Sequence, residues 1–385
     1  MSEFRTIREL CSVVVDCPHS TPKWTANGKI VIRNNNIKHG RIDFSSPSYT
    51  DDEHFAQRIK RAKPQPGDII ITREAPIGDV GMIPENTECC LGQRMVLLRA
   101  NQSVCDNFYL LYSLQSLYVQ HQISWSEGTG TTVSNLRIPH LEQIQIPYLP
   151  LEQQAKISSV LRALEEKIEN NRRLNDNLQQ QAMSLYAEMF LNSSDSNVTS
   201  GTLSDIAVIT MGQSPSGSSY NEDGVGEVFY QGRAEFGFRF PKRRLFTTEP
   251  KRMAEAGDVL LSVRAPVGEL NIAYERCCIG RGLGAIHSKT GHSSFILYTM
   301  FALRSQLDVF NGEGTVFGSI NRDALNAIPI DIPPVTEIDQ FEVVAHPIDE
   351  LIRANYEENC RLEAIRDSLL PKLMSGEIDV SAVQL

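Results

Sequence analysis

Arginine, lysine, asparagine and glutamine gather in loop-like stretches in both halves of the 385-residue sequence. Arginine and lysine can contact phosphates and the edge of guanine, while asparagine and glutamine present the matching pair of groups to adenine. These residue types in loops therefore favour contact with duplex DNA. The candidate contact residues are, in the first half, His19, Ser20, Thr21, Lys23, Arg33, Asn34, Asn35, Asn36, Arg73, Gln93 and Arg94, and, in the second half, Gln213, Ser214, Tyr220, Gln231, Arg233, Lys242, Arg243, Arg264 and Arg281.

Two further stretches are rich in basic residues. Residues 58–63 hold four of them, and residues 233–252 hold seven basic and two acidic residues, interleaved with phenylalanines. Each stretch could equally be a solvated basic face, and the phenylalanines are more typical of a core than of a surface on which bases stack. Five candidates beside repeated glycine motifs could support the fold instead of touching DNA, namely Arg73, Gln93, Arg94, Arg264 and Arg281.

No catalytic constellation accompanies these residues in the sequence. The Walker A loop, the Gly-x-Ser-x-Gly turn and the His-Glu-x-x-His zinc motif are absent. The Asn-Pro-Pro-aromatic motif of amino-methyltransferases is also absent, because the one Pro-Pro pair follows Ile332. The eight histidines are scattered, and no strong metal-ligand spacing appears. We therefore expect a chain that is not an enzyme by itself and holds neither metal nor cofactor.

Composition is typical of a soluble globular protein, with 41% hydrophobic and 22% charged residues. No apolar run is long enough for a transmembrane helix, and the N-terminus lacks the apolar core of a signal peptide. The eight cysteines include the adjacent pairs Cys89-Cys90 and Cys277-Cys278, but no Cys-x-x-Cys motif. We expect reduced thiols that mostly fill the core of a cytoplasmic protein.

The net charge of −10 is unevenly distributed along the chain. Residues 335–385 contain 4 basic and 11 acidic residues, whereas residues 1–150 contain 15 of each. Residues 196–334 are also nearly balanced, with 13 basic and 14 acidic residues. The acidic total therefore does not exclude a nucleic-acid partner, because each of these two large segments can carry a local basic face.

The first large segment, residues 1–150, alternates short β-like runs with glycine, proline and asparagine. It predicts a small mixed β-sheet with short helices. The expected elements are strands at residues 30–32, 69–72 and 95–98, a helix over residues 107–122, a Gly/Thr-rich loop at residues 127–132, and a strand within residues 141–150.

Residues 151–190 contain neither glycine nor proline and predict one long helix. Apolar residues recur every seven positions in two rows, which indicates a coiled-coil seam. At about 1.5 Å per residue the helix is roughly 60 Å long. The two rows are Ile157, Leu164, Asn171, Leu178 and Leu185, and Leu161, Ile168, Asn175, Ala182 and Met189.

The partner of this seam lies 184 residues later in the same chain. Asparagine stands in the middle of all four rows, which predicts that Asn171, Asn175, Asn355 and Asn359 set the register of two paired helices; solvent-facing asparagines are the alternative. Pro347 and Pro371 predict a second helix that is kinked or shorter, and Arg366 breaks its apolar row. The second pair of rows is Phe341, Ile348, Asn355, Leu362 and Leu369, and Ala345, Ile352, Asn359, Arg366 and Leu373.

The large segments repeat as well. A polar linker, residues 192–201, precedes the second copy. The chain is thus a tandem duplication, with domains at 1–150 and 196–334, a helical segment and linker at 151–195, and a final helical segment at 335–385. The matching motifs are residues 67–72 with 257–262, 75–78 with 265–268, 89–92 with 277–280, 130–131 with 314–315, and Leu141, Ile144 and Ile146 with Leu325, Ile328 and Ile330.

Within this repeat, residues 16–37 and 212–233 share almost nothing. A duplicated scaffold with divergent insertions is typical of two binding domains with different specificity. Neutral drift of surface loops is the alternative.

The order of these features, found twice over nearly the full length, resembles the specificity subunit of Type I restriction-modification systems. The residues that carry the resemblance include the Gly-Asp-hydrophobic run before Ala-Pro-x-Gly, the helix entry at residues 150–154 and the closing stretch at residues 369–378. It implies an α+β fold with two target recognition domains alternating with two long helices, which pair as an antiparallel coiled coil with pseudo-twofold symmetry. Each domain is then expected to read half of a bipartite, asymmetric DNA site, with the helices setting the spacer.

The resemblance also implies partners that perform the chemistry. Two modification subunits bring S-adenosylmethionine and methylate adenine, and two restriction subunits complete an ATP- and Mg-dependent nuclease in phage defence. Two other interpretations stay open, a coiled-coil scaffold that does not bind DNA and a specificity subunit of a methylation-only or other phage-defence complex. A fused enzyme is disfavoured by the missing motifs.

Overall fold

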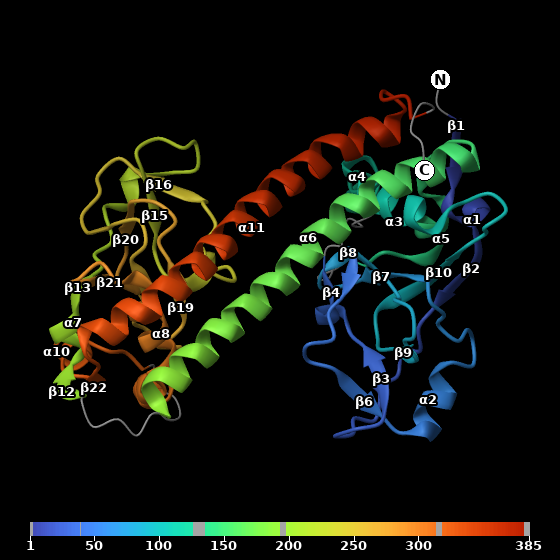
Figure 1. Cartoon of the computed structure of the whole chain (residues 1–385). Helices are drawn as coiled ribbons and strands as arrows, with labels where there is room; N and C mark the ends of the chain where they lie inside the picture. Colours follow the sequence, from blue (N-terminus) through green and yellow to red (C-terminus); the bar gives the residue numbers. More distant parts are fainter. Residues whose placement is uncertain (1–2, 39, 126–134, 193–197, 313–317, 381–385) are drawn as a thin grey trace. The chain divides into compact units, whose positions relative to one another are not determined.

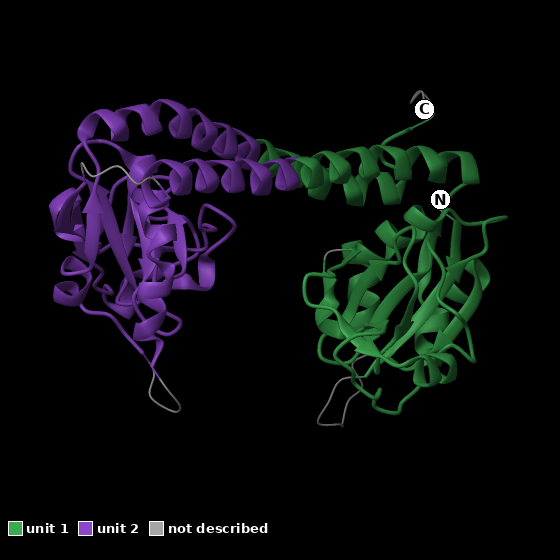
Figure 2. Cartoon of the chain, turned by 60° about the horizontal axis from the view of Figure 1, so that its bottom comes forward, with its two compact units in different colours: residues 1–170, 358–385 green, residues 171–357 purple. Residues whose placement is uncertain are grey.

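The computed structural model describes residues 3–38, 40–125, 135–192, 198–312 and 318–380. The chain divides into two compact units (Figure 2), residues 1–170 with 358–385 and residues 171–357. Each unit therefore combines one globular part with segments of both long helices. The repeated Gly/Thr motif at residues 130–131 and 314–315 lies outside the described residues.

The first unit is built on a four-stranded antiparallel sheet with the strand order β2-β10-β7-β8. A three-stranded sheet, β6-β3-β9, lies beside it, and in that sheet β3 and β9 run parallel. Figure 1 labels most of these elements. The strands are β1 (Glu3–Thr6), β2 (Cys11–Asp16), β3 (Lys29–Ile32), β4 (Ile37–Lys38), β5 (Arg41–Ile42), β6 (Ser48–Thr50), β7 (Ile69–Arg73), β8 (Ile77–Met82), β9 (Cys89–Leu91), β10 (Met95–Ala100) and β11 (Gln145–Tyr148), and the helices are α1 (Ile7–Leu10), α2 (Asp52–Arg58), α3 (Asn107–Gln115), α4 (Leu117–Trp125) and α5 (Ile138–Gln143).

The second unit repeats this strand order, with β13-β21-β18-β19 in one sheet and β14-β16-β15-β20-β17 in the other. Here β15 and β20 are the parallel pair. The strands are β12 (Thr199–Thr202), β13 (Ala207–Met211), β14 (Tyr220–Asn221), β15 (Glu227–Tyr230), β16 (Leu245–Thr247), β17 (Met253–Ala254), β18 (Val259–Ser262), β19 (Leu270–Ile272), β20 (Cys277–Ile279), β21 (Leu283–Ser288) and β22 (Pro329–Ile332), and the helices are α7 (Leu203–Ile206), α8 (Ser293–Ala302), α9 (Arg304–Asp308) and α10 (Arg322–Asn326).

Two long helices complete the chain, α6 (Leu151–Tyr186), which continues through a π-helical turn at Ala187–Leu191, and α11 (Val335–Ser375). All twenty positions of the predicted apolar rows are buried or half-buried. The covered face of both helices is therefore the one that the seven-residue spacing predicted. In the first unit Ile157 and Leu161 of α6 share a core with Leu373 of α11, and in the second Ala182 shares one with Phe341.

Pro347 and Pro371 do not interrupt or shorten α11, so the prediction of a shorter helix is wrong. The helix spans 41 residues, compared with 36 in α6. Both prolines are exposed, and so are Val343 and Asp367, whose carbonyl groups lose a helical partner. The freed carbonyls lie on the exposed face, where water can satisfy them.

Three smaller predictions also need correction. The single helix expected at residues 107–122 is two helices, because Ser116 is extended (φ −63°, ψ 146°) and its hydroxyl donates to the Ser113 carbonyl. Part of the strand expected within residues 141–150 is the end of α5, and only Gln145–Tyr148 is strand. The end of the expected linker is strand β12, which pairs with β22.

The cysteines fill the core as expected. Cys89, Cys90, Cys277 and Cys278 are fully buried in β9 and β20, and Cys360 on α11 is the exposed one. Burial raises the pKa of the Cys89 and Cys277 thiols to about 12, so both are protonated at neutral pH.

Candidate nucleic-acid interface

A pair of parallel strands in each unit brings two candidate loops to one edge. Both strands of a parallel pair end on the same side, so the residues after β3 and after β9 meet, as do those after β15 and after β20. Together with the loops that are hydrogen-bonded to them, we call these regions the first and second edge. The first edge includes Arg33, Asn34, Arg73, Glu74, Gln93 and Arg94, and the second edge includes Gln231, Arg233, Lys242, Arg264 and Arg281.

Glycine allows the two loops of each edge to lie against each other. The amide of Gly92 donates to the Ile32 carbonyl, and that of Gly280 donates to the Tyr230 carbonyl, both at 2.8 Å. A Cβ atom at Gly280 would lie 2.8 Å from the Cα atom of Gln231, closer than side chains tolerate. The repeated Cys-Cys-x-Gly motif is therefore a close-approach site that positions the residues around it.

On the first edge, Arg73 is occupied by partners inside the protein. Its guanidinium contacts both carboxylate oxygens of Asp16 at 2.9 Å and donates to the Leu136 carbonyl at 2.8 Å. Its side chain is only 11% exposed. Asp16 also pairs with the exposed His19 at 2.9 Å. Arg73 thus supports the fold, the alternative that the sequence left open.

Glu74 is the common partner of three neighbouring polar residues. Its carboxylate accepts from Arg94 at 3.1 Å and from Asn135 at 2.6 Å, and its backbone carbonyl accepts from Asn34 at 2.7 Å. Arg94 remains about half exposed and adopts a positive φ of 65°. Three polar side chains at the first edge, Asn34, Arg94 and Asn135, therefore share Glu74 as their partner.

The loop that carries Ser20 and Thr21 is fixed by a buried arginine. Arg58 is 7% exposed and donates to four carbonyls, those of Pro18, Ser20, Leu91 and Gly92, at 2.7 to 3.2 Å. The sequence assigned Arg58 to a basic run that suits DNA, and this assignment is wrong, because its donors face inward. Gln93 adds bonds to the His19 carbonyl and the Thr21 hydroxyl.

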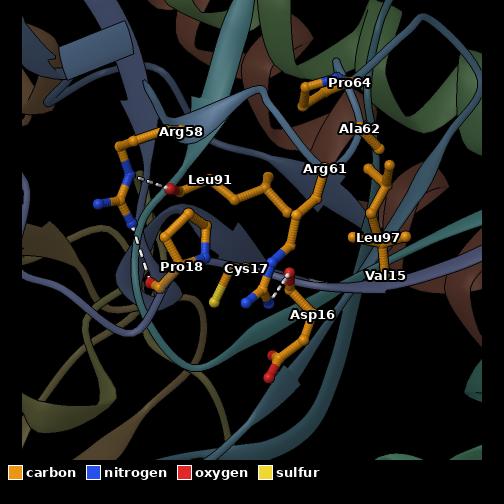
Figure 3. Close-up of a pocket in the computed structure, with 10 residues that line it drawn as sticks. All are labelled: Val15, Asp16, Cys17, Pro18, Arg58, Arg61, Ala62, Pro64, Leu91 and Leu97. Atoms are coloured by element: carbon orange, nitrogen blue, oxygen red, sulfur yellow. Dashed lines mark hydrogen bonds between the residues drawn. The ribbon is translucent and has the colours of Figure 1, made fainter. Parts of the chain in front are cut away.

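Figure 3 shows Arg58 beside a small hollow lined by residues of this loop, including Asp16, Cys17 and Pro18. Arg61 also lines the hollow, and its guanidinium donates to the Asp16 carbonyl at 3.4 Å. The hollow encloses too little space for a nucleotide base, with room for about one water molecule. We therefore regard it as packing beneath the loop, not as a binding pocket.

The remaining candidates of the first unit differ in exposure. Asn36 is buried and bonds to the Asp43 carbonyl and the Arg33 amide, so it has a structural role. Lys23 is exposed and pairs with Asp51 at 3.2 Å. The exposed side chains left to face a partner are His19, Ser20, Thr21, Lys23, Arg33 and Asn35.

The second edge has a different electrostatic character. Four of its basic candidates are exposed and have no acidic partner within 4 Å among the residues that the structure describes. They are Arg233, Lys242, Arg264 and Arg281. The amide of Val263 donates to the Gly282 carbonyl at 3.0 Å, which brings the Arg264 loop beside that of Arg281. Gln213 and Ser214 join them, since the backbone amide of Gln213 donates to the Ile279 carbonyl and the Ser214 hydroxyl accepts from the backbone amide of Arg281.

Not every candidate of the second unit belongs to this group. Arg243 pairs with Glu275. Tyr220 donates to the Pro215 carbonyl at 3.1 Å and packs against Phe229. The phenylalanines of the basic run follow the core alternative, because Phe236, Phe240 and Phe246 are buried or pack against the core and only Phe238 is exposed.

The central asparagines of the long helices are buried and make contacts between α6 and α11. In the second unit, Asn355 donates to the Asn175 side-chain carbonyl at 2.8 Å, and Asn175 donates to the Ile352 carbonyl at 3.3 Å. In the first unit, Asn359 donates to the Ile168 carbonyl at 3.3 Å. Asn171 is 3% exposed. Arg366, which breaks the apolar row, lies 3.9 Å from Glu165 on α6.

Sequence reasoning missed several residues that organise these edges. Glu74 and Asn135 were not singled out, and neither were Arg41 and Arg239, which contact the long helices. Their partners are distant in sequence, so no local motif indicated them. Within the described ranges, no cluster of three metal-ligating side chains occurs, and no helix is both long and apolar enough to span a bilayer.

Comparison with known proteins identifies the repeated unit. Residues 3–180 and 195–359 each match the Type I restriction modification DNA specificity domain. The specificity subunit of the type I restriction enzyme MjaIX from Methanocaldococcus jannaschii is 24% identical over 346 residues, covering 82% of this chain and 78% of the relative. A protein of the same archaeon that is assigned to a type I restriction enzyme called MjaX is 28% identical over 400 residues, covering 98% of this chain and 94% of that protein.

A solved structure shares the fold. The S subunit of a Type-I restriction-modification system from M. genitalium superposes with a TM-score of 0.59 at 19% identity, covering 97% of this chain and 96% of that one. The family match covers both globular parts and most of both long helices. The chain therefore belongs to the Type I restriction modification DNA specificity family and contains two copies of its domain.

Proposed function

We propose that each edge reads one half of a bipartite, asymmetric DNA site. The observation that carries the proposal is the duplicated parallel-strand edge, in which one scaffold presents two different sets of polar side chains. Different side chains on equivalent loops are what two unlike half-sites require. The proposed recognition domains are residues 1–150 and 196–334.

The long helices, in this proposal, pair as an antiparallel coiled coil and set the spacer between the half-sites. Two observations support the pairing. Lys167 near the middle of α6 contacts Glu358 of α11 at 3.1 Å, and Asn175, eight residues later in α6, contacts Asn355, three residues earlier in α11. Buried asparagines would then fix the register. With antiparallel helices, the proposal also includes a pseudo-twofold relation between the two repeated domains.

In this proposal the chain itself contributes specificity and its partners contribute catalysis, in agreement with the name of the MjaIX relative, a specificity subunit. We propose that its partners are duplex DNA, two modification subunits and two restriction subunits in the cytoplasm. S-adenosylmethionine, ATP and Mg would belong to those subunits. The exposed faces of the helices are available for docking them.

The direct test is a genome-wide map of methylated adenine in cells with and without this gene. The expected result is a bipartite motif that disappears on deletion and gives both half-sites and the spacer. Absence of any motif, together with no duplex binding at low salt in the presence of the modification subunit, would favour the scaffold alternative.

Two changes to the chain test which parts read the half-sites and which part sets the spacer. Replacing residues 1–150 with those of a relative should change one half-site only, and a change in both would contradict the modular proposal. Inserting four residues beside Asn175 should alter the spacer or abolish methylation. An unchanged spacer would show that the helices do not measure it.

A further inference from the structure

A buried arginine ties the second edge to a long helix. Arg239 is 3% exposed and contacts the carboxylate of Asp349 on α11 at 3.0 Å. The hydroxyl of Tyr298 on α8 donates to the same carboxylate at 2.9 Å, and the Arg239 guanidinium lies over the Tyr298 and Phe301 rings. We call Arg239, Tyr298 and Asp349 the second anchor.

The first unit contains an equivalent set. Arg41 donates to the backbone carbonyl of Glu165 at 2.9 Å and to the carboxylate of Glu169 at 2.7 Å, both on α6. The hydroxyl of Tyr112 on α3 donates to the Glu165 carboxylate at 3.3 Å. We call Arg41, Tyr112, Glu165 and Glu169 the first anchor.

The two anchors occupy the same positions in the repeat. Arg41 follows the end of β3 at Ile32, and Arg239 follows the end of β15 at Tyr230, by nine residues in each case. Asp349 stands 184 residues after Glu165, the offset that relates the helices. The surrounding segments otherwise share almost no sequence. Because the two anchors stand at equivalent positions while the residues around them differ, both anchors are expected to have the same role.

Each anchor fixes the far end of a segment whose near end lies on an edge. In the second unit, this segment begins with Gln231 and Arg233 and returns at Lys242, whose amide donates to the Glu235 carbonyl at 2.8 Å. The Arg239 carbonyl also accepts from the Ile272 amide at 2.8 Å. The edge residues are therefore connected to α11 through a short, hydrogen-bonded path.

We propose that Arg41 and Arg239 are positioning residues that set the orientation of each recognition edge on its helix, and so the spacing at which a half-site is accepted. The inference rests on the proposed function for its DNA consequence, whereas the mechanical part stands on the contacts alone. The anchor in the second unit is the stronger one, because Arg239 is buried and Arg41 is 38% exposed.

The mechanical part is tested by hydrogen exchange on the full chain without DNA. In Arg239→Met, the amides of Phe236 and Lys242 should exchange about tenfold faster, while that of Ser262 in β18 should not change. Asp349→Asn should act in the same direction, and Arg239→Lys should act less, since it keeps the charge without the planar fork. Unchanged exchange of Phe236 and Lys242 in Arg239→Met would overturn the proposal.

The matched control is Arg276→Gln. Arg276 is an exposed arginine of the same unit that pairs with Glu227 and Glu255, both outside α11. This variant should leave the exchange of the Phe236 and Lys242 amides as it is in the parent chain. Equal acceleration in Arg276→Gln and Arg239→Met would overturn the assignment to the anchor.

The DNA consequence is tested with the complex of this chain and its modification subunit, on duplexes with the native spacer and with one base pair more or less. Arg239→Met should raise the relative methylation of the altered spacers about tenfold without changing the half-site sequences, an effect that mere loss of folded protein cannot produce. The proposal would be overturned if the Arg239→Met complex still methylates DNA and keeps the parent preference for the native spacer. If the parent complex methylates no bipartite site, the proposed function fails, and the exchange measurement still decides the anchor.

Discussion

The two recognition edges carry opposite charges at one equivalent scaffold position. Glu74 and Arg264 both precede the repeated Ala-Pro turn, at Ala75 and Ala265. Glu74 binds Arg94 and Asn135, whereas Arg264 is exposed and has no acidic partner in the described part of the chain. One exchange of charge thus separates an edge in which a carboxylate pairs with Arg94 from an edge with several unpaired cations.

This contrast predicts two modes of contact. Unpaired cations on the second edge should contribute phosphate contacts and a steep dependence of affinity on salt. The first edge, with its carboxylates engaged and its loop fixed by Arg58, should rely more on hydrogen bonds from positioned side chains. A shared scaffold can therefore divide affinity and sequence reading unequally between two half-sites.

The largest effect is expected at the arginine that fixes the first edge. Arg58→Met leaves four carbonyls without a donor and should destabilise the first unit by about 3 kcal/mol. The free energy of unfolding in urea, monitored by hydrogen exchange of the amides in β7 and β10, measures this loss of stability. Arg61→Met is the matched control and should cost less than about 0.5 kcal/mol, because Arg61 is exposed and makes one long bond. Equal losses of stability would show that Arg58 does not hold the loop.

The next effect concerns the cations of the second edge. Arg264→Gln with Arg281→Gln should weaken duplex binding by about 1–3 kcal/mol and reduce the salt slope by about one for each phosphate that the variant no longer neutralises. Titration of the complex with duplex DNA at several salt concentrations measures both quantities. Arg276→Gln, whose guanidinium pairs with Glu227, should change the slope less. A slope that stays unchanged in the double variant would remove the electrostatic contrast between the edges.

A smaller effect of opposite sign is expected on the first edge. Glu74→Gln frees Arg94 from its ion pair and should strengthen duplex binding about threefold, as expected for one exposed ion pair of roughly 0.6 kcal/mol. The same titration measures it. Glu88→Gln also removes a carboxylate that pairs with two lysines, Lys29 and Lys63, and serves as the control for net charge. Equal gains in both variants would mean that only total charge matters.

The smallest effect is a pH dependence at Asp51. The backbone amide of His54, with further bonds from the His54 ring and Lys23, lowers the pKa of this carboxylate to about 2. Because the folded pKa is below the unfolded value near 4, the contribution to stability is present above that value and is lost as pH falls toward 2. Asp51→Ala should remove this acid sensitivity from α2. Hydrogen exchange of the Phe55 amide, measured as a function of pH, tests this. Identical acid profiles would contradict the assignment.

The helices and strands follow from local sequence patterns, whereas the partners of the charged side chains do not. The apolar rows and the central asparagines were predicted because heptad spacing leaves a local signal. The glycine motifs marked the repeat, but their close backbone approach became visible only in the structure. The roles of Arg58 and Arg239 were not predicted, and that of Arg73 was left open between two alternatives, since each is decided by partners tens of residues away or more. The continuity of α11 was also missed, because exposure of Pro347 and Pro371 depends on what covers the other face.

The most direct test of two independent edges is a methylated-adenine map of the complex with Gln231→Ala and Arg281→Gln. Both residues lie where β15 and β20 end, so they belong to one edge only. The account predicts relaxed sequence requirements in one half-site, with the other half-site and the spacer unchanged. Changes in both half-sites, or an unaltered motif from a folded complex, would contradict it.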